Sequence, residues 1–454
     1  MDNSQAVRGL GGTGSKGLPW SAFAALSLGM MVYGLAESYG PVAYASGLTK
    51  NAWLGYSLPF VFGGVGALLA GYLSDKLGRR RAFILTGGLL LLGLLLYIPV
   101  YLNWTSSALG QALLVASIAI VGMTAIGLET PILAAIAEGA DPQGRSKMLV
   151  LAQNFGNLGV ALAFVPLVLL HGQAAQTVQV ETALLLMYLA PTVALIIAFL
   201  RAFESLPWIA ARTGTIDVKE AWKQVDGGAA PVQPTTGLRA RFATLLTIGI
   251  AQDVAFVYVT YGVASFFTST FSGLSASSLV PMVGGFAMTI VGVLTGLFIA
   301  HRVERRPFAL LSFALQAVFW AALAIATYLT GFTMSWLMLA LFILNFVTVE
   351  LTWASRALLE PELFPTKVRG LYISLVRMSV WVITGVITGL MTNLEPLATD
   401  FTAAALVMGL VAVAGAAGAA FWRFYGFETA NRSLVGLDLH HIGPIAERKE
   451  AGSS

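Results

Sequence analysis

Long apolar runs separated by short polar stretches are the dominant pattern of this sequence. An α-helix needs about 20 mainly apolar residues to cross a bilayer, and twelve windows of that kind can be read along the chain. They lie near 20–45, 52–74, 82–102, 108–137, 147–170, 183–203, 242–270, 278–300, 308–330, 333–358, 370–392 and 401–425. The pattern predicts an all-α membrane protein with twelve transmembrane helices.

Composition supports this prediction, because 57% of the residues are hydrophobic and only 11% are charged. A soluble protein of 454 residues would carry more polar surface. Residues 1–19 are polar and glycine-rich and lead directly into the first apolar window. We therefore expect the first helix to stay as an anchor and not to be cleaved as a signal peptide.

Enzymatic chemistry finds little support in the sequence. There is no cysteine, and the four histidines are scattered except for His440 and His441 in a polar tail, which is not the spacing of a metal site. The segment from Gly9 to Lys16 has the glycines of a phosphate loop, but its lysine and serine are reversed and no strand precedes it. No enzyme, metal or cofactor is predicted.

The cations indicate how the helices are oriented. All but two of the 26 lysines and arginines lie in the predicted tails, or in and beside the loops that follow even-numbered helices; the exceptions are Lys50 and Arg377. By the positive-inside rule, both termini of this multi-pass protein are predicted to be cytoplasmic, with the chain in the cell (plasma) membrane. Because the cations are dispersed among short loops, a nucleic-acid partner is not expected.

An internal repeat relates the two halves of the chain. Glu138 and Arg145 recur 224 residues later as Glu362 and Arg369. At an offset of 225, Gly71, Arg80, Arg81 and Phe83 correspond to Gly296, Arg305, Arg306 and Phe308. The predicted organisation is therefore a tail (1–19), a six-helix bundle (20–204), a linker (205–240), a second six-helix bundle (241–425) and a tail (426–454). Two such pseudo-symmetric bundles are typical of alternating-access carriers.

A glycine-punctuated loop separates the second and third windows, with the sequence Gly71-Tyr-Leu-Ser-Asp-Lys-Leu-Gly-Arg-Arg-Arg81. It resembles the signature loop of the major facilitator superfamily and matches every defined position of that loop. A basic loop that only stops translocation would explain the arginines but not the glycines or Asp75. The resemblance implies the superfamily fold and secondary transport.

Other loops resemble those of the sugar-porter and metabolite-proton symporter branch of the superfamily. Glu138 with Arg145, and Pro361-Glu-Leu-Phe-Pro-Thr-Lys-Val-Arg-Gly370, are similar to its Pro-Glu-x-x-Pro-x-x-x-Arg-Gly loops. Residues 203–208 and 427–434 are similar to its Glu-Ser-Pro-Arg-Trp and Pro-Glu-Thr-Lys-Gly-Arg-Ser-Leu motifs. The chain departs from the branch where the second signature copy lacks its aspartate and where Ala430 and Asn431 replace a lysine and a glycine.

Acids and arginines in these loops have a physical role beyond orientation. Carboxylates can bind the free amides of a neighbouring helix's first turn and can pair with arginines, and such contacts last only while the cytoplasmic helix ends are packed together. The resemblance implies this gating role for Asp75, Arg79, Glu138, Arg145, Glu204, Glu362 and Arg369. Asp75→Asn is expected to reduce transport more than substrate binding.

Ionisable residues within the apolar windows are a second candidate site. They are Glu37, Glu129, Asp253, Glu350 and one cation, Arg377. Intramembrane charges usually mark ion or substrate pathways, and an isolated carboxyl group there can take up and release a proton near neutral pH. The alternative is that some of them form static pairs.

Glu37 is the first choice for proton coupling, because related symporters carry an acid in the corresponding part of helix 1. Those symporters pair it with an arginine in helix 4, whereas residues 111–137 contain no arginine or lysine. Either Arg377 replaces that arginine, or coupling runs through Glu129, Asp253 or Glu350.

Polar and aromatic residues of the windows are candidates for substrate contact. The resemblance implies sugar contacts for Gln153 and Gln252, although Asp253 stands in place of a second glutamine and Tyr258 in place of an asparagine. Further candidates are Asn154, Asn157, Tyr261, Asn345, Trp353 and Trp381. Each could instead hydrogen-bond between helices.

The sequence therefore predicts a monomeric secondary transporter whose partners are a small-molecule substrate, protons and the lipid bilayer. A sugar-like or organic-acid metabolite taken up with protons ranks first. Exchange of organic cations or drugs for protons ranks second, because four intramembrane acids face one arginine. Facilitated diffusion follows, and a sensor that binds without transport is a further class.

Overall fold

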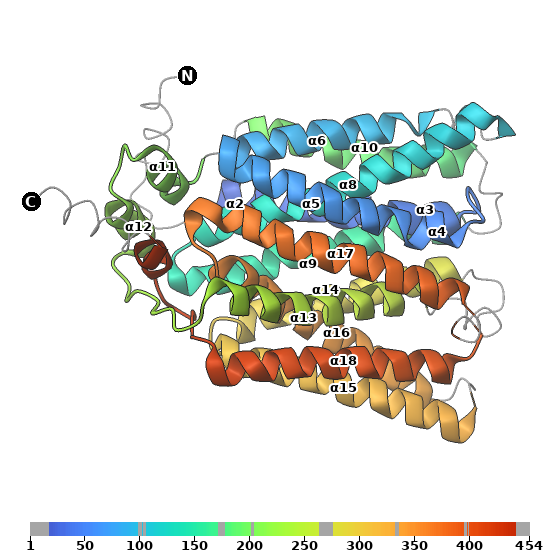
Figure 1. The fold of residues 1–454 in the computed structure, drawn as a ribbon. Helices are drawn as coiled ribbons and strands as arrows, with labels where there is room; N and C mark the ends of the chain where they lie inside the picture. The colour runs from blue at the N-terminus through green and yellow to red at the C-terminus, as the bar shows by residue number, and fades with distance from the viewer. Residues whose placement is uncertain are drawn as a thin grey trace, which may run out of the picture.

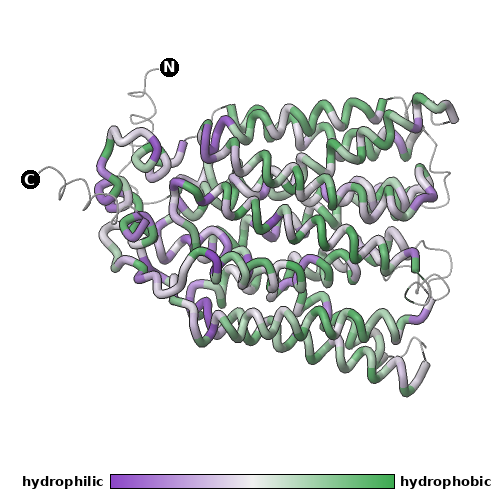
Figure 2. Tube along the Cα trace, viewed as in Figure 1, coloured by the Kyte–Doolittle hydropathy of each residue, from purple (hydrophilic) through white to green (hydrophobic). Residues whose placement is uncertain are grey.

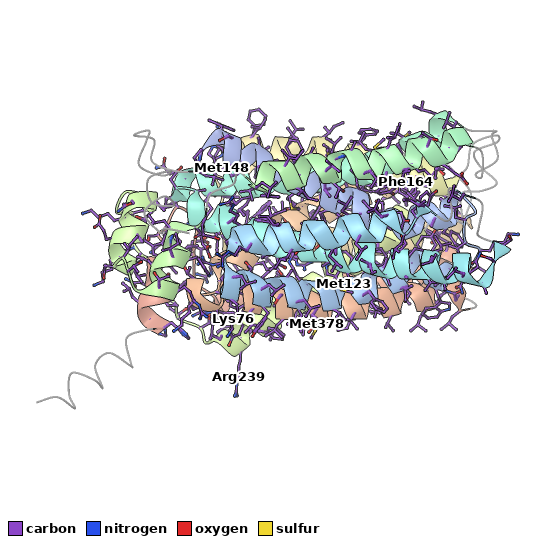
Figure 3. The ribbon with its side chains drawn as sticks, turned by 90° about the horizontal axis from the view of Figure 1, so that it is seen from above. Lys76, Met123, Met148, Phe164, Arg239 and Met378 are labelled. Atoms are coloured by element: carbon purple, nitrogen blue, oxygen red, sulfur yellow. The ribbon has the colours of Figure 1, made fainter. Side chains whose placement is uncertain are left out.

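The computed structural model describes residues 18–98, 102, 106–170, 178–200, 204–262, 276–331, 336–394, 397 and 399–441. Its helices run side by side along one direction, and the first and last described segments, near residues 20 and 435–441, lie at the same end of the bundle (Figure 1). We call that end the termini end. Figure 3 shows the bundle from a perpendicular direction, with Lys76 and Arg239 toward the termini end and Phe164 toward the opposite end.

Ten helices of the described chain are long and apolar enough to cross a membrane. The elements of the first half are α2 (Trp20–Glu37), α3 (Tyr39–Ala45), α4 (Ala52–Tyr56), α5 (Leu58–Leu77), α6 (Arg79–Leu95), α8 (Ala108–Gly139), α9 (Pro142–Leu169) and α10 (Val178–Leu200). Those of the second half are α13 (Leu238–Val257), α14 (Ala276–Leu294), α15 (Arg305–Thr330), α16 (Trp336–Glu362), α17 (Arg369–Asn393) and α18 (Phe401–Tyr425). We call α2–α10 the N-terminal half and α13–α18 the C-terminal half.

The ten spans confirm ten of the predicted windows. The other two windows contain α2 with α3, and α6, which fall outside the ten. The first is interrupted at Ser38, whose hydroxyl group donates to the carbonyl of Gly34, and α6 has 17 residues and begins with three arginines. Both still pack within the bundle, α2 against α9 and α6 against α8.

Apolar side chains cover the outside of the bundle, as expected for a surface in contact with lipid. Leu169, Leu410 and Phe424 are each more than 70% exposed. Figure 2 shows hydrophobic residues along the lengths of the helices and hydrophilic residues concentrated at the termini end. This distribution matches a membrane protein with its polar layer on one side.

Two seams join the halves, one between α5 and α17 and the other between α9 and α14. Glycines make the close approach possible. A Cβ atom at Gly71 would lie 2.3 Å from the carbonyl oxygen of Gly370, and one at Gly285 would lie 2.8 Å from the backbone nitrogen of Ala161. Small residues let helix backbones approach in this way in membrane proteins.

The connector between the halves is folded. It contains α11 (Leu206–Thr213) and α12 (Val218–Asp226), each begun by a polar N-cap, Ser205 and Asp217, and ended by a glycine with positive φ, Gly214 and Gly227. A short helix over 435–441 lies in the same layer, and the backbones pair where Val232 donates to Ser433. The predicted linker and the described part of the C-terminal tail, residues 426–441, thus form one polar layer at the termini end.

Candidate functional site

Arg79 is the centre of a buried charge cluster at the termini end of the N-terminal half. Its guanidinium binds both carboxylate oxygens of Glu138, at 3.1 and 2.6 Å, and Asp75 at 2.7 Å. Glu204 accepts the backbone N–H groups of Arg79 and Arg80, at 2.8 and 3.2 Å, and so caps α6. Burial raises the pKa of the Glu204 carboxyl group, and its backbone hydrogen bonds oppose that shift.

This cluster reaches across the seam to α17. Asp75 accepts the N–H groups of Gly370 and Leu371, at 3.0 and 2.7 Å, where the positive end of the helix dipole favours an anion. Arg369 donates to Glu138 at 2.8 Å. The N-terminal half is thus bound to the first turn of α17 by charge-assisted hydrogen bonds, which are stronger than neutral ones.

A second cluster repeats the arrangement in the C-terminal half. Arg305 binds both carboxylate oxygens of Glu362, at 3.0 and 3.1 Å, and Glu428 accepts the N–H groups of Arg305 and Arg306. Arg145 crosses the other seam to Glu362 at 2.8 Å. Together the two clusters form what we call the double latch, defined by Asp75, Arg79, Glu138, Arg145, Glu204, Arg305, Glu362, Arg369 and Glu428.

The double latch corrects the repeat register read from the sequence. The contacts equate Arg79 with Arg305 and Arg80 with Arg306, an offset of 226, rather than Arg80 with Arg305. The cause is a π-helical segment at Thr295–Ile299, since a π turn holds an extra residue. The seven residues that the sequence predicts to act as a gate therefore lie together in the structure, whereas the contacts of Arg305 and Glu428 within the same group were not predicted.

The polar layer contacts the latch through Asp438. Its carboxylate accepts the backbone N–H of Thr366 at 2.6 Å and the indole N–H of Trp222 at 2.8 Å, and the guanidinium of Arg369 lies 5.8 Å from the centre of the Trp222 ring. Burial raises the pKa of Asp438 above its ordinary value. The linker, the C-terminal tail and α17 meet at this residue.

A second group of charges lies deeper in the bundle. Arg377 binds Glu129 and Glu360 through its two terminal nitrogens. Arg356 binds Asp253 at 2.5 Å, and its other terminal nitrogen lies 3.7 Å from Glu360. All five side chains are at most 2% exposed. We call this row of residues, Glu129, Arg377, Glu360, Arg356 and Asp253, the charge chain.

The charge chain corrects the expectation that Arg377 is the one cation inside the bundle. Arg356 falls near the end of the window 333–358 and was counted with the cations beside the loop that follows, but α16 continues to Glu362, so Arg356 lies within the helix and binds Asp253. Gln252 also binds Arg356, at 2.8 Å. The oxygen of this proposed substrate ligand is therefore occupied within the charge chain.

Glu37 is buried without an arginine partner. It is 1% exposed, and neither of its carboxylate oxygens accepts a hydrogen bond of normal geometry. Tyr33 and Tyr261 are close enough to interact with it electrostatically. Tyr261 also bonds to Ser38 at 3.0 Å, across the two halves. A buried carboxyl group of this kind is costly unless it is protonated or binds a ligand.

Amide side chains surround the remaining acid. Asn157 donates to Glu350 at 2.6 Å and to Asn154 at 3.3 Å. The second oxygen of Glu350, the oxygen of Asn345 and both polar atoms of Gln153 are buried without partners. These three polar side chains thus retain free hydrogen-bonding groups inside the bundle.

Aromatic rings from both halves form a continuous cluster next to these groups. Trp353 packs against Tyr33 and Phe256, with ring centres 6.4 and 5.9 Å apart, and Phe60 lies between Tyr261 and Trp381. Three of the proposed aromatic contacts therefore belong to one cluster. The fourth, Tyr258, packs instead on Trp320 in the C-terminal half.

A profile of the family described as Major Facilitator Superfamily matches residues 7–164. YncC of Bacillus subtilis (strain 168), named as a candidate metabolite transport protein, is 25% identical over 356 residues, 71% of this chain and 72% of YncC.

Solved structures with a similar fold include that of the proton:xylose symporter XylE bound to 6-bromo-6-deoxy-D-glucose. It is 16% identical, the match covers 93% of this chain and 98% of XylE, and the TM-score is 0.73. A partially occluded inward-open conformation of XylE from E. coli is 17% identical over 90% of this chain and 98% of that one, with a TM-score of 0.66. At these identities the likeness concerns the fold.

Proposed function

We propose, from the premise that this chain belongs to the major facilitator superfamily, that it moves a small organic solute by alternating access coupled to protons. As a member of that superfamily it is a multi-pass secondary transporter and not an enzyme.

The proposed topology has twelve transmembrane helices in two pseudo-symmetric six-helix bundles. The ten long spans, together with α2–α3 and α6, supply the twelve. The termini end is the cytoplasmic side of the plasma membrane, because the cations of the loops and the polar layer lie there. The functional unit is a monomer, since substrate exchange between two bundles needs no second copy.

The double latch carries the proposal of alternating access. Its inter-half bonds, Arg369 to Glu138 and Arg145 to Glu362, join the halves at the termini end. Each acid also keeps an arginine of its own half, Arg79 or Arg305. The halves can therefore part while Glu138 and Glu362 each keep an arginine, which is what a reversible gate at this end requires.

Glu37 is the proposed proton site. It lies where the aromatic cluster and the charge chain approach each other, and in the described structure neither of its carboxylate oxygens accepts a hydrogen bond of normal geometry and no arginine forms an ion pair with it. A proton or a cationic group would remove the cost of burying that charge.

The proposed cargo is an uncharged polar metabolite, for which a sugar is the model. Free amide and carboxyl groups beside aromatic rings suit a ligand with several hydroxyl groups, and XylE is a proton:xylose symporter. An organic acid is less well supported, because both buried arginines of the described bundle interior, Arg356 and Arg377, are bound to acids.

Exchange of an organic cation for protons is the second candidate. In the part of the bundle interior that the structure describes, the acids Glu37, Glu129, Asp253, Glu350 and Glu360 face only Arg356 and Arg377. This excess of negative charge beside aromatic faces favours an ammonium ligand.

Uptake into proteoliposomes under an imposed pH gradient tests these proposals with labelled xylose and labelled tetraethylammonium as probes. We expect xylose to accumulate when the outside is acidic. Glu37→Gln should abolish this accumulation while sparing counterflow exchange. Intact pH-driven accumulation in that variant removes Glu37 from the role, and accumulation of tetraethylammonium alone, under the opposite gradient, favours the cation exchanger.

A further inference from the structure

Arg377 holds acids from both halves of the molecule at once. One terminal nitrogen binds Glu129 on α8 of the N-terminal half, and the other binds Glu360 on α16 of its own half. Helices α17 and α16 belong to the C-terminal half, so only the bond to Glu129 crosses between the halves. If the halves part, Arg377 keeps Glu360 and loses Glu129.

The charges of the C-terminal half balance without Glu129. Arg377 and Arg356 match Glu360 and Asp253 in number, and these four side chains form a continuous row of contacts. Separation of the halves therefore leaves a neutral group on one side and a single buried carboxylate on the other. Leaving a buried charge unpaired is strongly unfavourable.

The internal repeat does not reproduce the charge chain in the N-terminal half. At the offset of 224 that relates Glu138 to Glu362, the N-terminal positions matching Asp253, Arg356, Glu360 and Arg377 are Gly29, Ile132, Ile136 and Gln153. The double latch is symmetric and the charge chain is one-sided. Because the charge chain has no counterpart in the repeat, it can respond to an ion separately, while the two latch clusters hold the closed arrangement.

We propose that Arg377 exchanges partners as the transporter opens, and that Glu129 then takes up the proton that replaces the guanidinium. The inference rests on the proposed function and assigns the conformational switch to Glu129, with Glu37 as the site beside the cargo. Protonation of Glu129 releases Arg377 and favours opening at the termini end. Deprotonation restores the bond and favours closure.

Other ionisable groups near Glu129 come from four helices. They are Tyr33 and Glu37 on α2, Asp253 on α13, Arg356 and Glu360 on α16, and Arg377 on α17. On α5, α6 and α9 the charged latch residues Asp75, Arg79 and Arg145 lie at the termini end, and Glu138 of that end is nine residues along α8, roughly 13 Å away. Among the named acids of the charge chain, Glu129 alone changes its pairing when the halves separate.

The experiment measures opening directly and needs no cargo. Since the chain contains no cysteine, spin labels can be attached at Arg81→Cys and Arg239→Cys, two exposed positions at the termini end in different halves. Arg239 points away from the bundle (Figure 3). Double electron–electron resonance in proteoliposomes then reports the distance between the halves as pH is lowered from mildly alkaline to mildly acidic.

We expect the parent to shift toward the longer distance as pH falls. Glu129→Gln should hold the longer distance at every pH, because it leaves the C-terminal charges balanced. The matched variant Glu360→Gln should favour the shorter distance, because opening would then leave Arg377 unpaired. A Glu129→Gln variant with the parent's pH dependence overturns the proposal, and so does a Glu360→Gln variant that opens.

Glu129→Asp separates charge from packing. It keeps the carboxylate and should keep the pH dependence; loss of that dependence in both variants of Glu129 would assign the effect to packing and overturn the proposal. Failure of the parent to accumulate any solute, with the distance shifts intact, would reject the proposed function alone.

Discussion

Asp75→Asn should weaken the closed state at the termini end. Asp75 accepts Arg79 of its own half at 2.7 Å and the amides of Gly370 and Leu371 across the seam, at 3.0 and 2.7 Å. Opening breaks only the two bonds across the seam. An asparagine lacks the negative charge and turns an amide N–H, instead of an oxygen, toward one of those backbone N–H groups. The substitution therefore destabilises mainly the closed state, in which these bonds exist.

The size of the effect follows from these contacts. A hydrogen bond to a charged group contributes roughly 1.5–3 kcal/mol, and the substitution removes one such bond and weakens another. Taking about 2 kcal/mol for the difference between closed and open states, the ratio of open to closed molecules should rise about thirtyfold. Transport should fall more than substrate binding, because the gate no longer returns to closure efficiently.

Spin labels at Arg81→Cys and Arg239→Cys measure this ratio, and proteoliposome uptake measures transport. Asp141→Asn is the control, because Asp141 caps α9 through Gln143 and Gly144 within one half and asparagine is an equally good N-cap. The same distance distribution and the same uptake in Asp75→Asn and the parent would refute the assigned role. An equal shift in Asp141→Asn would refute the assignment to the seam.

Two further predictions concern the seam and the polar layer. Gly71→Ala should open the termini end and slow transport, because its Cβ atom would lie 2.3 Å from a backbone oxygen of α17. Gly88→Ala is the control, because no atom lies within 4 Å of the new Cβ, and it should leave the distance between the spin labels unchanged. Equal label distances in the two variants would contradict this prediction. The pKa of Asp438 is raised in the folded protein, so its contribution to stability is complete below the ordinary value of 3.8 and is lost as pH rises through the raised value. Hydrogen exchange of 435–441 should therefore quicken as pH rises, beyond the intrinsic rate, and Asp438→Asn should remove this excess; an unchanged excess would contradict the prediction.

The sequence predicted the grouping of charged residues at the termini end better than the pairings in the bundle interior. Glu138 and Arg145 repeat as Glu362 and Arg369 at one fixed offset, so a one-dimensional comparison finds them. Arg305 was aligned with Arg80 and not with Arg79, because the π-helical segment shifts the repeat by one residue just before Arg305. Sequence spacing does not report an extra residue in a helical turn.

The roles of most candidate cargo-binding and proton-coupling residues remain proposals. The contacts around these residues are set by helix packing. Arg356 lies near the end of an apolar window and reads from sequence as a loop cation, whereas the packing of α16 against α13 places it on Asp253. Glu360 looks like a neighbour of the gating Glu362, yet two residues along a helix turn a side chain to another face, and it binds Arg377 instead.

What the sequence alone determined is the set of apolar segments, their repeat and the acids and arginines at their ends, because bilayer thickness and the positive-inside rule act on each segment separately. Which acid each arginine binds, which carboxyl group is left without a partner, and which bonds cross between the halves were decided only by tertiary structure. The acid–arginine pairs join residues as much as 248 positions apart, as between Glu129 and Arg377, and only the rotation and approach of packed helices bring them within bonding distance.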